Sequence, residues 1–240
     1  MNKKECDFRV IFLPKLNLIN PTLESNLAKM TKELGRVAES VGKHRNLSGE
    51  KNSFNEEEVL DRMILKVLDL IQTCNTMMDL LEQKYEINVD SIFQEHVRKL
   101  AIERRYITED AVSKYEELIL NNIITNSSLC RIVALPKLNL LTPSIESNLI
   151  KMVEELGEVS ECVESYLIDT CVDIELINYN VLKELGKETL DVMQTCNTML
   201  TSLELNYGVD VKSKIPSHIN KLIEKKYVSK DILEEFRRSY

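Results

Sequence analysis

Apolar residues recur at intervals of three and four along most of the chain, and this spacing predicts amphipathic helices. The recurring positions are Leu27, Met30, Leu34, Val37 and Val41 in one stretch, and Leu149, Met152, Val153, Leu156 and Val159 in another. We therefore expect helices over 22–44 and 144–167, followed by a second long pair over 56–84 and 178–206.

Shorter helical stretches follow each long pair. We expect one over 89–104 and its counterpart over 211–226, with a linking helix over 109–124 and a C-terminal helix over 230–238. Few breakers interrupt these stretches, since the whole chain holds only 6 glycines and 5 prolines. Leu, Glu, Lys and Met are frequent in them, and these residues have high helix propensity.

Two prolines mark the expected starts of the first helix in each half. Asn20 and Thr142 can act as N-caps, because short polar side chains accept hydrogen bonds from the free amides of the first turn. Pro21 and Pro143 then occupy the first helical position, where the missing N–H is not needed. The apolar runs just before them, RVIFLP and RIVALP, are compatible with extended backbone, because proline disfavours the interior of a helix.

The chain also repeats itself with an offset of 122 residues. Residues 13–27 read LPKLNLINPTLESNL and residues 135–149 read LPKLNLLTPSIESNL, and QTCNTM occurs at both 72–77 and 194–199. Such self-similarity is typical of tandem copies of one structural unit. We expect a first unit over 1–126 and a second over 127–240. The boundary between them lies within the Asn- and Ser-rich segment 121–128.

Together these features predict an all-α fold. Each unit is a helical hairpin with additions, too small to bury both of its apolar faces alone. Two hairpins packed together complete a core of four helices. We therefore expect two tandem helical-hairpin repeats, packed as a pseudo-dimer around a four-helix-bundle core.

Composition narrows the class of partner. The net charge of −8 argues against binding to nucleic-acid polymers, which needs a basic face. No apolar run approaches the roughly 18 residues of a membrane span, so we expect no membrane partner. The 6 cysteines include no CxxC pair, which argues against a zinc site and favours buried free thiols. These features together favour a cytoplasmic protein.

Four acidic residues of the second half form the strongest candidate site. Glu155 and Glu158 lie three residues apart on one expected helix, and Glu188 and Asp191 have the same spacing on the next. Antiparallel packing of the two helices would bring all four carboxylates together, where Mg²⁺, or alternatively Mn²⁺, can neutralise them. The alternative is that the EExxE sequence is only a solvated helix face.

The first half carries a different set of charges at the same positions. Glu33, Arg36, Lys66 and Asp69 align with the four acidic residues and sum to zero charge, against −4 in the second half. The zero sum allows pairing without a metal, whereas −4 suits divalent ions. Asp191 also stands among apolar neighbours, where a carboxylate needs a partner. We therefore expect metal in the second half only.

The acidic segments carry a resemblance to a known family. EELGEVSE at 154–161 followed by KETLDVMQTCNTML at 187–200 resembles the EExxE…ExxD signature of the MazG-like, all-α nucleoside triphosphate pyrophosphatase superfamily. Both halves match the layout, but the acidic signature is intact only in the second. The resemblance implies Mg²⁺-dependent hydrolysis of a nucleoside triphosphate to the monophosphate and pyrophosphate. It also implies that Glu155, Glu158, Glu188 and Asp191 are metal ligands.

Further roles follow from the same resemblance. KLIEKKY at 221–227 is similar to a basic, Tyr-ended segment that lies near the phosphates in that family, which makes Lys221 and either Lys225 or Lys226 candidates for substrate contacts. The first half has KLAIERRY at 99–106, with one extra residue. Because family sites are commonly built at a subunit interface, we expect the first half to supply walls of the second half's pocket.

Several roles are open at the level of sequence. Glu154, Glu155 or Glu161 can position the attacking water or accept its proton. Asn197 can bind base or sugar, or serve helix packing. His96 and His218 are expected to be structural or capping residues rather than catalytic ones.

Two rival functions compete with hydrolysis. In the first, the protein holds a nucleotide without cleaving it, and Arg36 and Lys66 bind phosphate directly. In the second, the helices serve only assembly. The sequence also leaves open whether the pseudo-dimers pair again into a homodimer.

Overall fold

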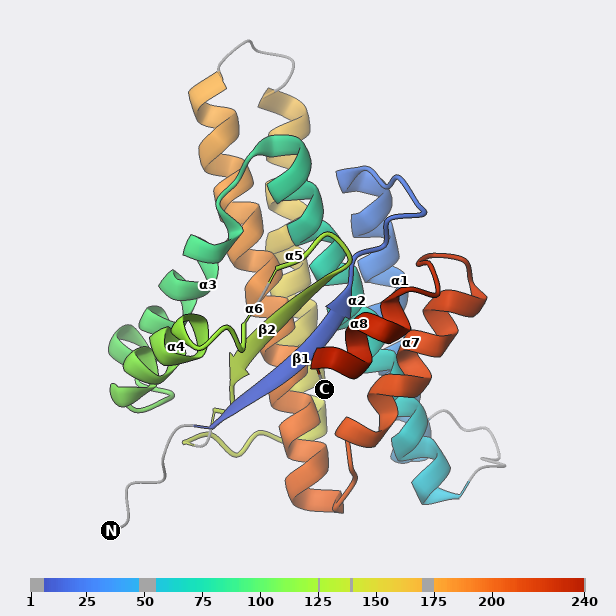
Figure 1. Ribbon diagram of the computed structural model, residues 1–240. Helices are drawn as coiled ribbons and strands as arrows, with labels where there is room; N and C mark the ends of the chain where they lie inside the picture. Colours follow the sequence, from blue (N-terminus) through green and yellow to red (C-terminus); the bar gives the residue numbers. More distant parts are fainter. Residues whose placement is uncertain (1–6, 48–54, 125, 139, 170–174, 240) are drawn as a thin grey trace.

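A computed structural model describes residues 7–47, 55–124, 126–138, 140–169 and 175–239. The chain is mostly helical, which confirms the expected all-α class, with one small two-stranded sheet in addition (Figure 1). The four long helices are α1 (Leu23–His44), α2 (Glu56–Tyr85), α5 (Ile145–Asp169) and α6 (Glu175–Tyr207). No helix in the part of the chain that the structure describes is long and apolar enough to cross a membrane.

The four long helices pack against one another and enclose most of the core. α1 packs along α2, α5 packs along α6, and the two pairs meet through α2 against α6 and α1 against α5. Met30, Ile71 and Met193 are fully buried, as is most of the apolar stripe on each helix. Burial of these stripes supplies the main stabilisation, at roughly 25 cal/mol per Å² of apolar surface.

The first helix of each half begins later than expected. Thr22, not Asn20, is the N-cap of α1: its hydroxyl accepts from the Ser25 amide at 3.2 Å, and the Ser25 hydroxyl accepts from the Thr22 amide at 2.8 Å. Pro21 therefore lies just outside the helix. This reciprocal capping satisfies two amides at once, which a cap at Asn20 could not do.

The start of α5 departs from expectation in the same way. The Ser144 hydroxyl accepts a hydrogen bond from the Ser147 amide at 3.1 Å, and the helix begins at Ile145. Thr142 and Pro143 precede it instead of serving as cap and first helical residue. A hydroxyl three residues before a free amide thus decides the boundary in both halves.

The two apolar runs form an antiparallel sheet of β1 (Phe8–Pro14) and β2 (Cys130–Pro136). The sheet lies across the helices (Figure 1). At the centre of the ladder, Ile11 faces Val133, and these two residues occupy the same position in the sequence repeat. A twofold axis through this pair would exchange the strands residue for residue.

The shorter helices cross from one half of the chain to the other. α3 (Val89–Arg98), the π-helical turn η1 (Lys99–Glu103) and α4 (Asp110–Leu120) follow α2, and α3 packs against α6. The turn η2 (Lys212–Lys214), α7 (Ile215–Glu224) and α8 (Ile232–Ser239) follow α6, and α7 packs against α2. In Figure 1 the green α3 and α4 and the red α7 and α8 lie on opposite sides of the long helices.

The π-helical turn accounts for the extra residue of the first half. KLAIERRY is one residue longer than KLIEKKY, and a π-turn accommodates one residue more than an α-turn. Beyond it the two segments match again, since Arg105 and Lys226 both adopt left-handed backbone, with φ of 55° and 57°. The predicted helix over 89–104 is therefore an α-helix that ends in a π-turn.

Candidate functional site

Three carboxylates of the second half converge between α5 and α6. Glu155, Glu188 and Asp191 each offer an oxygen atom, and these atoms all lie within 4.8 Å of one another. The i,i+3 spacing places Glu188 and Asp191 on the face of α6 that packs against α5. Among the residues that the structure describes, no other group of three His, Cys, Asp or Glu side chains meets this criterion.

The charged groups that act most strongly on Glu188 are other carboxylates. Burial raises the pKa of Glu188 to about 8, and the nearby Glu158, Asp191 and Glu155 carboxyl groups add to the effect. Its Oε2 atom is buried without a hydrogen-bond partner among the described residues. Burial also raises the pKa of Glu155, although Lys151 lies 2.6 Å from its Oε1 and opposes the change. A buried carboxyl in this state favours protonation or a bound cation.

Asp191 differs because the first half of the chain supplies it with two partners, a histidine and a lysine. His96 Nδ1 lies 3.0 Å from its Oδ1, and Lys99 Nζ lies 2.8 Å from its Oδ2. Burial alone would raise the pKa of Asp191, but the hydrogen bonds and charges of His96 and Lys99 outweigh it and lower the pKa to about 2. Asp191 is therefore ionised and held in position.

Close packing of α3 on α6 brings His96 and Lys99 to the cluster. A Cβ atom at Gly186 would lie 2.5 Å from the Ile92 side chain, so glycine permits an approach that a larger residue would obstruct. His96 follows Ile92 by one turn on α3, and its Nε2 lies 3.4 Å from Gln194 Oε1. His96 thus orients the Asp191 carboxylate from the last turn of α3.

A cavity of about 290 Å³ opens beside the carboxylates. Lys99, Arg104 and Tyr106 come to it from the first half, whereas Lys151 and Glu155 come from α5 and Asp191 from α6. The rest of the lining combines apolar and small polar side chains: Leu100, Leu138, Leu141, Pro143, Ser147, Asn148, Gln194, Thr195 and Thr198. The cavity therefore has a charged end, with both signs present, and a neutral end.

The structure gathers three of the four predicted metal ligands. Glu158 is exposed and lies at the edge, close enough to raise the pKa of Glu188 but outside the group of three. Of the residues considered for water activation, Glu155 lines the cavity. Glu154 is exposed with its Oε1 2.9 Å from Lys151, and Glu161 is exposed further along α5.

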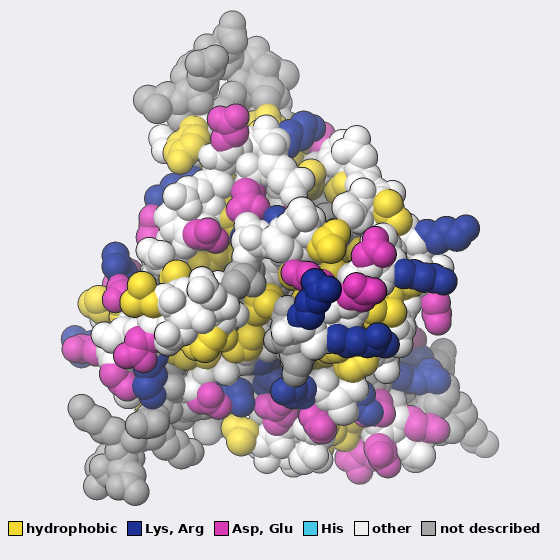
Figure 2. Space-filling model, viewed as in Figure 1, with side chains coloured by type: hydrophobic (Ala, Val, Ile, Leu, Met, Phe, Trp, Pro, Cys, Tyr) yellow, Lys and Arg dark blue, Asp and Glu magenta, His cyan; other side chains and the backbone are white. Residues whose placement is uncertain are grey.

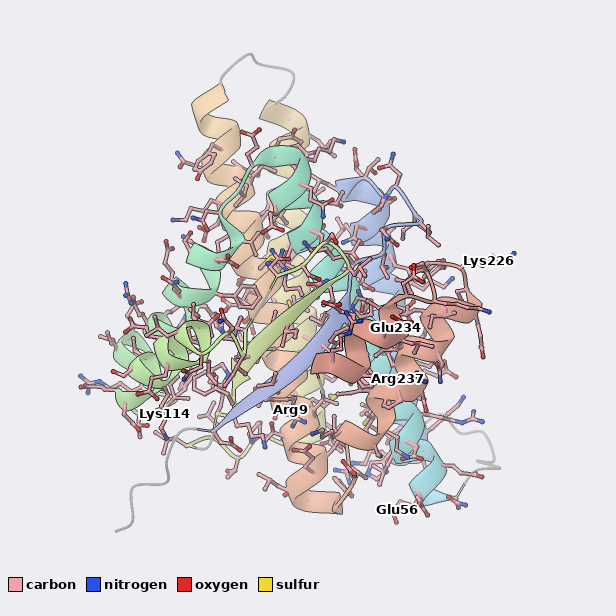
Figure 3. The ribbon with its side chains drawn as sticks, viewed as in Figure 1. Arg9, Glu56, Lys114, Lys226, Glu234 and Arg237 are labelled. Atoms are coloured by element: carbon pink, nitrogen blue, oxygen red, sulfur yellow. The ribbon has the colours of Figure 1, made fainter. Side chains whose placement is uncertain are left out.

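The predicted substrate contacts lie elsewhere. Lys221 binds the Asp69 carboxylate, at the position in the first half that corresponds to the acidic cluster. Lys225 and Lys226 are exposed beyond it, and Lys226 points away from the body of the molecule (Figure 3). Because α7 crosses to α2 rather than to α6, none of these lysines lines the cavity beside Glu188.

Asn197, Arg36 and Lys66 do not line that cavity either. The Asn197 amide is engaged within the fold: it donates to the Pro136 carbonyl at 2.9 Å and accepts from Arg9 Nε at 2.7 Å. Arg36 pairs with Glu33 at 2.8 Å. The described ion pairs of Asp69 come from His218 and Lys221, not from Lys66 as the charge balance suggested.

Sequence reasoning did not assign Lys99, Arg104 and Tyr106 to the acidic cluster, although a signal was present. His96 and Lys99 align with His218 and Lys221, so the same pair recurs at the same offset in both halves. The structure uses both pairs in the same manner, each against the Asp of the other half.

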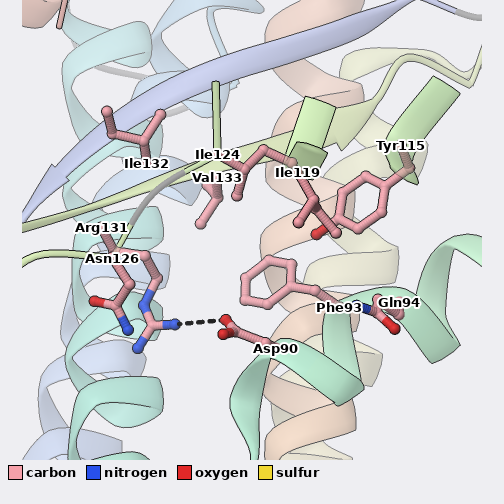
Figure 4. A pocket seen from close by; sticks show the side chains of 10 residues that line it. All are labelled: Asp90, Phe93, Gln94, Tyr115, Ile119, Ile124, Asn126, Arg131, Ile132 and Val133. Carbon is pink, nitrogen blue, oxygen red and sulfur yellow. Dashed lines mark ion pairs between the residues drawn. The ribbon is translucent and has the colours of Figure 1, made fainter. Parts of the chain in front are cut away.

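A second cavity, of about 120 Å³, lies between α3, α4 and β2 (Figure 4). Phe93, Tyr115 and Ile119 form its apolar wall, and Asp90 faces Arg131 across 3.7 Å at its polar end. None of the predicted site residues lines it. Arg131 is already paired with Glu82 at 2.8 Å, so this cavity offers no comparable chemistry.

Comparison of the chain with models of protein families, with curated proteins and with solved structures finds no match.

Proposed function

We propose that this chain is a Mg²⁺-dependent nucleoside triphosphate pyrophosphohydrolase, which adds water across the bond between the α- and β-phosphates and releases the monophosphate and pyrophosphate. The observation that carries the proposal is the convergence of Glu155, Glu188 and Asp191 beside a cavity, with one buried Glu188 oxygen left without a partner. The resemblance to the EExxE…ExxD signature supports the same function.

The donor set fits a hard divalent cation. Mg²⁺ and Mn²⁺ prefer carboxylate oxygens and retain positions for water and substrate phosphate. Glu155, Glu188 and Asp191 are the residues that would hold the ion, with Glu158 available at the edge. When bound, the ion would neutralise phosphate charge and lower the pKa of a bound water.

The chain's own residues supply the rest of the site. Lys99, Arg104 and Lys151 line the charged end of the cavity, where they can bind the phosphate chain through charge-assisted hydrogen bonds. Glu155 lies at the same end and can orient the attacking water or accept its proton. The neutral end, with Tyr106, Leu138 and Asn148, offers apolar surface and an amide for the nucleoside.

The proposal includes the architecture that produces this site. We infer two tandem units packed as a pseudo-dimer, with α1, α2, α5 and α6 as its four-helix core. Two reciprocal ion pairs support it: Arg9 pairs with Glu204 and Arg131 with Glu82, each at 2.8 Å. Arg9 and Arg131 are repeat equivalents, as are Glu204 and Glu82. In such a pseudo-dimer each unit completes the other's site.

Turnover of a nucleotide panel tests the function. Wild-type protein with Mg²⁺ should release pyrophosphate, and no orthophosphate, from at least one nucleoside triphosphate. Glu188→Gln should lower this rate by about 100-fold or more, because loss of a charged ligand removes stabilisation of the reacting phosphate. Glu164→Gln, an exposed carboxylate on α5, is the matched control and should retain the wild-type rate. Equal rates in Glu188→Gln and wild type would contradict the proposal.

A second candidate function is nucleotide binding without cleavage. One observation favours it: Lys99 already neutralises Asp191 without an ion, and His96 lies on the other carboxylate oxygen. The same panel separates the two functions, because this candidate predicts nucleotide binding with no release of pyrophosphate at saturating Mg²⁺.

A further inference from the structure

The corresponding position of the first half holds a cationic cluster instead of an acidic one. Its two carboxylates lie at the base, with Glu33 1% exposed and Asp69 7% exposed. Lys29 and Arg36 each lie 2.8 Å from a Glu33 oxygen. Asp69 is paired with Lys221, and His218 Nδ1 lies 3.3 Å from it. Both carboxylates are therefore already neutralised from within the protein.

Two further lysines of this cluster are not needed to neutralise the two carboxylates. Lys66 lies one turn before Asp69 on α2, and Lys225 follows Lys221 by one turn. Neither forms a hydrogen bond or an ion pair among the residues that the structure describes, although the Lys225 ammonium lies 5.8 Å from the Tyr227 ring. Burial lowers the pKa of Lys225, and the neighbouring Lys221 charge lowers it further. The Glu33, Asp69 and Glu39 carboxylates lie close enough to act on these cations, but the cations outnumber them, so the cluster keeps an excess of positive charge.

The net charge of this cluster is opposite in sign to that of the equivalent positions in the second half. In the first half the seven positions hold five cations and two carboxylates, for a net +3: Lys29, Glu33, Arg36, Lys66, Asp69, Lys221 and Lys225. In the second half they hold three cations and four carboxylates, for a net −1: Lys151, Glu155, Glu158, Glu188, Asp191, Lys99 and Arg104. The sign reverses where Arg36 and Lys66 replace Glu158 and Glu188. Positive side chains thus stand where the second half has the carboxylates of Glu158 and Glu188.

The cations are also the accessible part of the cluster. The side chains of Lys29, Arg36 and Lys221 are 36%, 34% and 26% exposed, whereas both carboxylates lie beneath them. An arriving anion therefore meets ammonium and guanidinium groups first. On the face shown in Figure 2, Lys and Arg side chains are prominent on the side of α7 and α8, the side from which Lys221 and Lys225 come.

We propose that this cluster, formed by Lys29, Arg36, Lys66, Lys221 and Lys225, is a second binding site, which takes a phosphate-bearing anion such as pyrophosphate or a nucleotide without a divalent metal. Guanidinium groups bind phosphate oxygens in pairs, and ammonium groups add compact charge. The built-in cations take the place that a metal ion would have at the other site. This binding is independent of whether the acidic site hydrolyses anything.

Titration calorimetry with pyrophosphate in the presence of EDTA tests the proposal. Wild-type protein should bind one pyrophosphate per chain, since chelation leaves the acidic site without an ion. The double variant Lys66→Gln, Lys225→Gln should bind at least about tenfold more weakly, because it loses two charged contacts. Lys114→Gln is the matched control. It removes one lysine charge from α4, at the opposite side of the molecule (Figure 3), and this variant should bind pyrophosphate as wild type does.

Titrations of other variants and with other ligands locate the site and define what it binds. Glu188→Gln and Arg104→Gln alter only the acidic site and its cavity, so pyrophosphate should bind both variants normally. A nucleoside monophosphate should bind in EDTA, whereas the same nucleoside without phosphate should not. The proposal is overturned if wild type binds no pyrophosphate in EDTA, if the double lysine variant binds normally, or if Arg104→Gln abolishes binding. Because Lys66 and Lys225 form no described ion pair, the melting temperature of the double variant should stay near that of wild type.

Discussion

At the scale of single residues, Glu188 is the side chain whose surroundings least suit its own charge. It lies on α6 against other carboxyl groups, and one of its oxygens is buried without a partner. A buried polar atom without a hydrogen bond costs about 1–3 kcal/mol. Such a cost persists in a fold where the group serves a function, and the function that we propose for Glu188 is the binding of a cation.

The first prediction follows from this cost. Glu188→Gln should be at least as stable as wild type in EDTA at pH 7, because burial raises the pKa of the Glu188 carboxyl to about 8 and folding must therefore protonate it, a cost that an amide avoids. Thermal melting of both proteins in EDTA measures the effect, and added Mg²⁺ should raise the melting temperature of wild type only. A melting temperature several degrees below that of wild type in EDTA would show that Glu188 stabilises the fold.

Residue identities at the acidic site were predictable only in part. Helical spacing placed Glu155, Glu188 and Asp191 together, since residues three apart share a helix face. Lys99 and Arg104 could not be assigned to the same site from spacing, because their approach depends on which long helix α3 crosses. That choice is made by tertiary packing, including the close contact at Gly186.

At the scale of elements, the crossing of α3 and α7 connects the two halves through buried aspartates. Asp69 on α2 is paired with His218 and Lys221 of α7, as Asp191 on α6 is paired with His96 and Lys99. Burial opposes ionisation of Asp69, but the nearby His218 and the hydrogen bonds and charge of Lys221 lower its pKa to about 2. The pairing therefore holds α7 against α2 as long as Asp69 is ionised.

The second prediction concerns acid. A pKa depressed from 3.8 to about 2 contributes stability that is present above pH 4 and lost as pH falls from about 4 to about 2. The contribution is on the order of 2 kcal/mol, at 1.36 kcal/mol per pKa unit. Urea unfolding of wild type and Asp69→Asn at several pH values measures it: the two free energies should converge toward pH 2. A constant difference across this range would exclude the pairing as its cause.

The third prediction tests the π-helical turn. Deleting the exposed Ile102 gives this segment the length found in the second half, so the turn should revert to α-helix and shift Arg104 relative to Lys99. We expect KM for the nucleotide to rise roughly 10- to 100-fold, since hydrogen bonds to charged groups contribute about 1.5–3 kcal/mol. The melting temperature should change little. An unchanged KM would remove Arg104 from the phosphate-binding set.

Element positions were predictable to within a few residues where the apolar spacing is regular, as in α1 and α2. Helix starts were less so: Asn20 and Thr142 were expected as caps, but hydroxyl groups at Thr22 and Ser144 form the actual ones. The pairing of β1 with β2 could not be foreseen, because the two strands are more than 100 residues apart and hairpin signals do not connect them.

At the scale of the whole molecule, each half has buried polar groups that find their partners in the other half. β1 finds its only described strand partner in β2, and Arg9 and Arg131 each pair across the halves. The Arg131 side chain is only 2% exposed, and removal of the first half would take away its partners Asp79 and Glu82. Removal of either half would also expose the surface where α2 packs against α6. Such surfaces favour aggregation or self-association when exposed.

The fourth prediction therefore concerns the separate halves. Residues 1–126 and 127–240, expressed alone, should each be poorly soluble or self-associate, and mixing them should restore a stable complex. Size-exclusion chromatography and thermal melting measure both outcomes. Two monomeric halves, each with a sharp and independent melting transition, would show that the units are finished domains, and the shared cavity would then need another explanation.

The most direct test of the central claim is the position of Mn²⁺ in crystals soaked with the ion, located by its anomalous scattering. The account predicts a peak bounded by Glu155, Glu188 and Asp191, with none beside Glu33 and Asp69, where Lys29, Arg36 and Lys221 already occupy the carboxylates. A peak beside Glu33 and Asp69 instead, or no peak at Glu188 at saturating Mn²⁺, would contradict it.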